Sequence, residues 1–135
     1  MIEITDKPIS PELVSNNVIT NSSGCVLAYI GLIREYSRGK SVLSVEYKDL
    51  KEMAENRLRE VADEVRQKWQ INNIAICHRV GKLKVGDINI VVALASTHRH
   101  EAFAACQYII DQFKQRMPTR KTETYQDGSI WVEGE

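Results

Sequence analysis

The chain has 135 residues, 43% hydrophobic and 27% charged, which is the composition of a globular protein folding as a single domain over residues 1–135. Its eighteen basic residues balance eighteen acidic ones, which argues against general nucleic-acid binding, because such binding depends on a cationic surplus. The sequence has neither a signal-peptide pattern nor an apolar run near the roughly 20 residues that cross a bilayer, so a membrane location is not expected.

The first third of the chain predicts a helix and a strand. Residues 1–9 are expected to form an edge strand or a loose start. Ser10 and Pro11 are typical of a helix start, with serine as the N-cap and proline in the first turn. The nearly continuous apolar run 25–33 predicts a buried strand, and the polar segment 35–40 predicts a mobile loop.

The middle of the chain alternates strand and helix patterns. Residues 42–47 alternate apolar and polar side chains, which predicts a half-buried strand. Residues 49–69 place apolar side chains on one face of an amphipathic helix. Residues 74–80 and 88–95 are two further predicted strands, and we interpret the segment 81–86 as their connection.

The last third predicts a second helix and a hairpin. Residues 99–117 carry an apolar face that includes Phe103, and Pro118 ends the helix. Asp127-Gly128 predicts a turn between the strands 122–125 and 130–132. Because helices and strands do not alternate regularly, the sequence predicts an α+β fold with a mixed or antiparallel sheet and two main amphipathic helices.

Several cationic residues are candidates for an anion site. With Thr97 as N-cap, His98 and Arg99 would begin a helix, where free N–H groups and the helix dipole favour an anion. Arg34 follows an apolar strand and could point toward a ligand. For each of them, a solvated polar side chain is the alternative interpretation.

Lys114 and Lys121 are candidates for acyl chemistry, because an ammonium group can stabilise an oxyanion or transfer a proton. Lys114 could instead complement the negative end of its helix.

Cys77 and His78 are neighbours on a strand and point to opposite sides, so they cannot share a metal ion. Cys25, Cys77 and Cys106 lie among apolar residues, which indicates reduced core thiols in a cytoplasmic protein.

Five blocks of sequence resemble the large, catalytic subunit of molybdopterin synthase, and the resemblance is strongest over residues 24–133. The two most specific blocks are His78-Arg79-Val80-Gly81 and His98-Arg99-x-x-Ala102-Phe103. The others, in chain order, are Gly24 to Arg34, Val45-Glu46-Tyr47 followed by Met53-Ala54, and Pro118-x-x-Lys121-x-Glu123.

The resemblance implies an α/β-hammerhead fold and a homodimer at the centre of a heterotetramer. A small ubiquitin-like sulfur-carrier subunit would insert its C-terminal Gly-Gly thiocarboxylate and transfer sulfur to cyclic pyranopterin monophosphate, forming the dithiolene of molybdopterin. Neither a metal nor a cofactor is implied. Lys114 and Lys121 match the catalytic lysines of the family. The positions that match substrate-contacting residues are Leu32, Ile33, Arg34, His98, Arg99, Lys114, Lys121, Thr122 and Glu123.

The chain departs from the family at Thr119-Arg120, where a bulky apolar residue and a tryptophan are usual, and at Thr122, where the family tends to have a base. This departure motivates one alternative, a non-catalytic scaffold that binds the ubiquitin-like partner. A second alternative is a persulfide carrier that uses one of the three cysteines. Retention of both lysines argues against the first, and the apolar setting of the thiols argues against the second.

Overall fold

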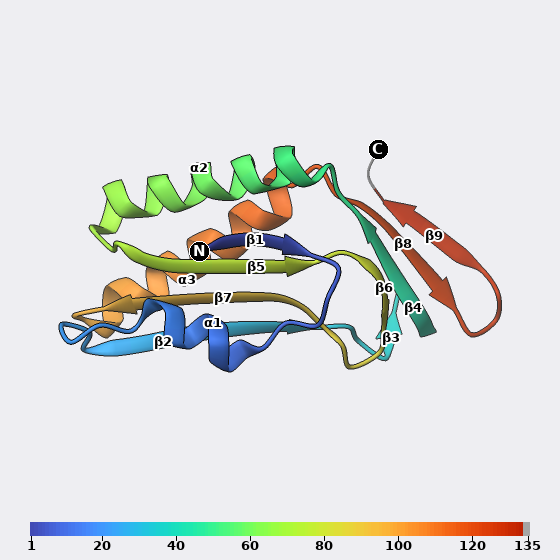
Figure 1. Cartoon of the computed structure of the whole chain (residues 1–135). Coiled ribbons are helices and arrows are strands. Elements are labelled where there is room, and N and C mark those ends of the chain that lie inside the picture. The colour runs from blue at the N-terminus through green and yellow to red at the C-terminus, as the bar shows by residue number, and fades with distance from the viewer. Residues whose placement is uncertain (134–135) are drawn as a thin grey trace.

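The computed structural model describes residues 1–133, which form two β-sheets and three helices (Figure 1). The elements in chain order are β1 (Ile2–Thr5), α1 (Pro11–Val18), β2 (Cys25–Leu32), β3 (Tyr36–Ser37), β4 (Lys40–Lys48), α2 (Lys51–Trp69), β5 (Asn73–Arg79), β6 (Gly81–Lys84), β7 (Ile88–Ser96), α3 (Arg99–Arg116), β8 (Arg120–Tyr125) and β9 (Ile130–Glu133). This arrangement confirms the predicted α+β class. No helix within residues 1–133 is long and apolar enough to span a membrane.

The first sheet has the strand order β1-β5-β7-β2, with β1 parallel to β5 and the other pairs antiparallel. Alternate residues of its central strands face opposite sides. Ile74 and Ile76 of β5 pack in the core beneath α2 and α3, whereas Ala75 and Cys77 pack with residues of α1. The sheet is therefore covered on both faces, which explains why the central parts of β5 and β7, residues 74–77 and 90–95, are wholly apolar.

The second sheet stands beside the first, at the right of Figure 1, and has the order β3-β4-β8-β9, with β6 also paired to β4. All of these pairs are antiparallel. Its inner face has a separate core, which includes Val45 and Tyr47 of β4, Leu83 of β6 and Tyr125 of β8. The predicted hairpin at Asp127-Gly128 is confirmed as the β8–β9 turn.

The predicted helices are confirmed, with differences at their ends and faces. The Ser10 hydroxyl accepts a hydrogen bond from the Leu13 amide at 3.3 Å and caps α1. The N-cap of α3 is His98 and not Thr97, and its side chain makes no capping hydrogen bond. Phe103 was predicted on the buried face of α3, but its side chain is 60% exposed. It lies outside the face of α3 that packs against the first sheet. The buried residues of α3 are Ala102, Ala105, Cys106 and Ile109.

Three strand predictions need correction. The run 25–33 was predicted as a buried strand, but β2 is an edge strand of its sheet and alternates half-buried and exposed side chains. Residues 35–40 are not simply a loop, because β3 pairs with β4 around a turn at Arg38 and Gly39, both at positive φ. Residues 81–86 include β6, whose pairing with β4 joins the connection to the second sheet.

Candidate functional site

A small cavity of about 40 Å³ lies where the end of β2 meets the second sheet, and five of the predicted substrate-contacting residues line it. Three of these residues, Leu32, Ile33 and Arg34, come from the end of β2 and the segment after it. Lys121 and Glu123 come from β8. The remaining lining residues are Ser37, Val42, Val45 and Tyr47.

Strand register places the two β8 residues at this cavity. Lys121 lies opposite Tyr47 of β4, and Glu123 lies opposite Val45. Directly opposed residues on neighbouring antiparallel strands share one face of a sheet, so these four side chains point the same way. Thr122 lies between the two β8 residues, and the alternation of a strand turns it to the other face. It does not line the cavity, unlike the other predicted residues of β8.

Glu123 is a buried carboxylate held by several donors, with its side chain only 3% exposed. Ser37 donates to its Oε1 at 2.9 Å, and the Tyr125 hydroxyl donates to the same oxygen at 2.7 Å. Burial alone would raise the pKa of Glu123, but these hydrogen bonds and the charge of Lys121 outweigh burial and hold the pKa below its usual value. Glu123 is therefore a fixed negative charge at neutral pH.

Lys121 is held by that charge. Its Nζ lies 3.5 Å from Glu123 Oε2 and 6.0 Å from the centroid of the Tyr47 ring, and its side chain is 28% exposed. The ammonium group is thus anchored at one side and remains open to a ligand at the other. An anion entering the cavity would meet this group together with Arg34, which is exposed at the rim.

Sequence reasoning missed several residues at this site, among them Tyr47 and Arg38. Burial raises the pKa of Tyr47, whose hydroxyl accepts a hydrogen bond from Asn89 at 3.2 Å. The Arg38 side chain is about half exposed, and its guanidinium lies 3.2 Å from the centroid of the Trp131 ring and 3.9 Å from Glu123. The alternation of 42–47 could have placed Val45 and Tyr47 on one face, but nothing local indicated that β8 would pair there.

His98 and Arg99 lie at the opposite end of the first sheet. Cys25, the first residue of β2, pairs with Ser96 near His98, whereas Leu32, its last residue, lies at the small cavity. Eight strand residues at about 3.3 Å each separate these ends by roughly 25 Å. One chain therefore does not bring Arg34 together with His98 and Arg99.

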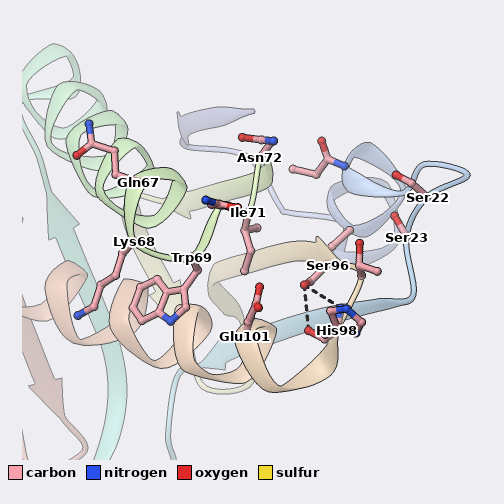
Figure 2. A pocket seen from close by; sticks show the side chains of 14 residues that line it. Ser22, Ser23, Gln67, Lys68, Trp69, Ile71, Asn72, Ser96, His98 and Glu101 are labelled. Carbon is pink, nitrogen blue, oxygen red and sulfur yellow. Dashed lines mark hydrogen bonds between the residues drawn. The ribbon is translucent and has the colours of Figure 1, made fainter.

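His98 instead borders a larger, open pocket of about 550 Å³, shown in Figure 2. The Ser96 hydroxyl donates to the His98 carbonyl at 2.9 Å and accepts from the His98 amide at 3.2 Å, so the backbone at the start of α3 is fixed. The other labelled side chains around this pocket are polar, apart from Trp69 at the end of α2 and Ile71 just after it. The His98 and Arg99 side chains are exposed.

Lys114 is exposed on the last turn of α3 and does not line the small cavity. Two residues further on, Arg116 ties the same turn to α2 through Glu64, with nitrogen–oxygen distances of 2.6 and 2.7 Å. Seven residues separate Lys114 from Lys121, with Pro118 between them. The position of Lys114 is thus set by the packing of α3 against α2.

The cysteines do not contribute to either pocket. Cys25, Cys77 and Cys106 are free thiols, and the last two are buried. Burial raises the pKa of Cys77 to about 12 and that of Cys106 to about 11. Such thiols are poor nucleophiles at neutral pH, because the thiolate is the reactive form. Within residues 1–133, no group of three or more histidine, cysteine, aspartate or glutamate residues is placed to hold a metal ion.

Comparisons with known proteins point to one family and one fold. A family model described as MoaE protein matches residues 4–116. Molybdopterin synthase catalytic subunits from Bacillus subtilis and Homo sapiens are 35% and 36% identical over 130 and 131 residues. These matches cover 96% and 97% of this chain and 83% and 70% of the two relatives. The crystal structure of molybdopterin synthase from Staphylococcus aureus superimposes with a TM-score of 0.93 at 32% identity, covering 99% of this chain and 97% of that one.

Proposed function

The chain belongs to the MoaE protein family, and from this premise we propose that its small cavity is the catalytic site of a molybdopterin synthase. The observation that carries the proposal is the meeting of Leu32, Ile33, Arg34, Lys121 and Glu123 at one cavity. The protein is a sulfurtransferase of molybdenum cofactor biosynthesis.

The sulfur donor is a second protein. The C-terminal Gly-Gly thiocarboxylate of a small ubiquitin-like subunit enters the cavity. Its sulfur forms a C–S bond to a side-chain carbon of cyclic pyranopterin monophosphate, and the C–O bond at that carbon breaks, so that an oxygen substituent leaves. The resulting thioester is then hydrolysed, which leaves sulfur on the pterin and a carboxylate on the small subunit. Two such transfers form the dithiolene. Because the nucleophile arrives on the partner, the catalytic chain needs no reactive cysteine.

The cationic residues serve the charges of this reaction. The incoming tail is an anion. During its attack the negative charge moves to the departing oxygen, and during hydrolysis of the thioester negative charge develops on the carbonyl oxygen. A preorganised ammonium group stabilises these charges. We assign this role to Lys121, anchored by Glu123, and to Lys114. Arg34, His98 and Arg99 are assigned to the substrate phosphate, because guanidinium and imidazolium groups bind phosphate oxygens through charge-assisted hydrogen bonds.

We further propose the assembly and location. Residues 1–135 act as one domain, two copies form a homodimer, and a small subunit at each end completes a heterotetramer. A solved complex of subunits 1 and 2 of molybdopterin-converting factor from Helicobacter pylori shares this fold, with a TM-score of 0.79 at 11% identity. The reduced thiols suit a cytoplasmic location.

The decisive experiment is the conversion of cyclic pyranopterin monophosphate to molybdopterin, with the purified chain and a thiocarboxylated small subunit. We expect Lys121→Ala and Lys114→Ala each to lower turnover by roughly a hundredfold or more, because each removes a stabilising charge. Lys7→Ala, which removes an exposed lysine in the segment after β1, is the matched control and should retain wild-type turnover.

Near-normal turnover by either active-site variant would contradict the role assigned to that lysine. If the wild-type chain binds the small subunit but forms no molybdopterin, the non-catalytic scaffold becomes the better description.

A further inference from the structure

His78 and Asp49 form a buried ionisable pair close to the proposed catalytic site, and the sulfur-transfer chemistry does not use it directly. His78 lies on β5, and Asp49 lies in the short segment between β4 and α2. His78 Nε2 is 3.4 Å from Asp49 Oδ2, and both side chains are completely buried. Outside this contact, neither Asp49 oxygen nor His78 Nε2 has a hydrogen-bond partner in the part of the chain that the structure describes.

The pair must share one proton. His78 Nδ1 lies 2.9 Å from the carbonyl oxygen of Asn89, which can only accept, so Nδ1 carries a hydrogen. Burial lowers the pKa of His78, while the charge of Asp49 and the Asn89 carbonyl act in the opposite direction. If Nε2 and Asp49 both lacked a proton, a lone pair would face a buried carboxylate. One proton between them keeps the pair neutral and fixes the imidazole in a single orientation.

The fixed imidazole packs between two aromatic rings. One ring lies near Lys121, and the other belongs to the residue that precedes Lys114. The imidazole meets the Tyr47 ring edge-on at a centroid distance of 5.4 Å, and the Phe113 ring at 5.0 Å. Tyr47 lies opposite Lys121 in the β4–β8 register. Phe113 directly precedes Lys114 on α3.

Asn89 ties the arrangement together. Its carbonyl accepts from His78, and its side-chain amide donates to the Tyr47 hydroxyl at 3.2 Å. A shift of the imidazole would therefore be transmitted to Tyr47 by two routes, the ring contact and the Asn89 hydrogen bonds.

We propose that the His78–Asp49 pair is a positioning device that sets Lys114 and Lys121 relative to each other. The imidazole acts as a rigid spacer between the end of α3 and β4, and Asp49 fixes its rotation. The lysines touch the reactants, and the pair acts only through them. This inference rests on the proposed function of the lysines. It adds a positioning role for His78 and Asp49, neither of which lines the cavity.

Turnover kinetics of the complex with the thiocarboxylated small subunit give the first test. Asp49→Ala removes the partner of Nε2, and we expect kcat to fall about tenfold or more, since small displacements of catalytic groups are costly. The KM for the pterin precursor should stay within about twofold, because the residues assigned to the phosphate are untouched. Asp49→Asn should restore most of kcat, because its amide can donate to a neutral His78.

Two further variants separate positioning from stability. Ile74→Ala shortens a buried side chain on the same strand, and it should lower Tm while leaving kcat near wild type. Phe113→Leu keeps an apolar side chain at the end of α3 but loses the ring contact, and it serves as the milder test if Asp49→Ala fails to fold. Wild-type kcat in a folded Asp49→Ala or Phe113→Leu complex would overturn the proposal.

Nuclear magnetic resonance of 13C-labelled lysine side chains gives a second test that needs no turnover. In the complex with the unactivated small subunit, Asp49→Ala should shift the Cε resonances of Lys114 and Lys121, whereas Ile74→Ala should not. Unchanged lysine resonances in Asp49→Ala would refute the positioning role. A wild-type protein without sulfur transfer would instead contradict the proposed function, so the two failures can be distinguished.

Discussion

Glu123 shows how one residue organises the electrostatics of the cavity. A carboxylate that is 3% exposed is stable only with compensating partners, and here Ser37, Tyr125 and Lys121 supply them. The contact with Glu123 holds the Lys121 ammonium group in place, while the Lys121 side chain remains 28% exposed. The negative charge of Glu123 thus serves the fold and, through Lys121, the proposed chemistry.

The first prediction concerns the pH dependence of stability. The pKa of Glu123 is lowered in the folded protein, so its contribution to stability is full above its unfolded pKa, near 4.5, and disappears as pH falls through the lower folded value. We expect Glu123→Gln to be less stable than wild type at pH 7, with a difference that shrinks as the pH falls below about 4.5. Urea denaturation from pH 7 to pH 3 measures this difference.

Glu60→Gln, at an exposed position of α2, is the matched control for that series. A stability difference between wild type and Glu123→Gln that stays constant over the whole pH range would mean that the Glu123 contacts do not depend on its charge.

The second prediction concerns the thiols. Replacement of Cys25, Cys77 and Cys106 by alanine should leave sulfur transfer largely intact, since the sulfur arrives on the partner subunit and the two buried thiols have raised pKa values. Molybdopterin formation by the triple variant is the measurement. If transfer is lost while the circular dichroism spectrum remains native, the persulfide-carrier alternative regains support.

At the scale of elements, the short helix α1 depends on its cap. It has eight residues, and its buried side chains Val14 and Val18 pack on the face of the first sheet opposite α2 and α3. A helix this short is unstable alone, so the cap and the packing must act together.

The third prediction is that Ser10→Ala lowers the free energy of unfolding by about 1 kcal/mol, because the Leu13 amide loses its acceptor. The 3.3 Å bond is long, which favours the lower part of the usual range of roughly 0.5–2 kcal/mol. Equilibrium urea unfolding measures it. Asn17→Ala on the same helix is the control and should be neutral or slightly stabilising; an equal loss in both variants would refute the capping role.

Local sequence patterns predicted which segments form helices, strands and turns better than they predicted where those segments lie in the sheets. The cap at Ser10, the stop at Pro118 and the turn at Asp127-Gly128 each depend on a few adjacent residues, and each was predicted correctly. The run 25–33 was predicted as buried, but whether a strand lies at an edge depends on strand order, which is a non-local property. The short strand β6 was missed for the same reason, since it exists only through its pairing with β4.

The candidate site was predictable in part. The alternation of β8 places Lys121 and Glu123 on one face, so their proximity follows from spacing alone. Their meeting with Arg34 depends on contact between two sheets, and no local pattern encodes that contact. The family resemblance provided this information, whereas local patterns left Arg34, His98 and Arg99 with a solvated alternative and Lys114 with a role at the end of its helix.

At the scale of the whole molecule, the predicted substrate residues fall into two groups at opposite ends. Arg34 and Lys121 lie at the small cavity, and His98 and Arg99 lie at the start of α3. Lys114 lies fifteen residues after Arg99 on α3, which is about 22 Å along a straight helix. A small bicyclic pterin does not span that distance, so we expect one chain alone not to supply all of the predicted substrate contacts.

The fourth prediction follows from this separation. We expect each active site to be shared, with His98 and Arg99 from one protomer and Lys114 and Lys121 from the other, so that two-fold symmetry creates two equivalent composite sites. An Arg99→Ala protein and a Lys114→Ala protein should each be nearly inactive. A hybrid dimer of the two would contain one intact site and one site with both lesions.

Mixing the two variants therefore measures the architecture of the site. With random reassortment, half of the dimers are hybrids and each has one good site of two, so activity should recover to roughly a quarter of wild type. If both groups served one pocket from one chain, every site would carry a lesion and mixing would restore nothing. Native mass spectrometry of differently tagged protomers confirms subunit exchange, and exchange without recovery of activity would contradict the shared site.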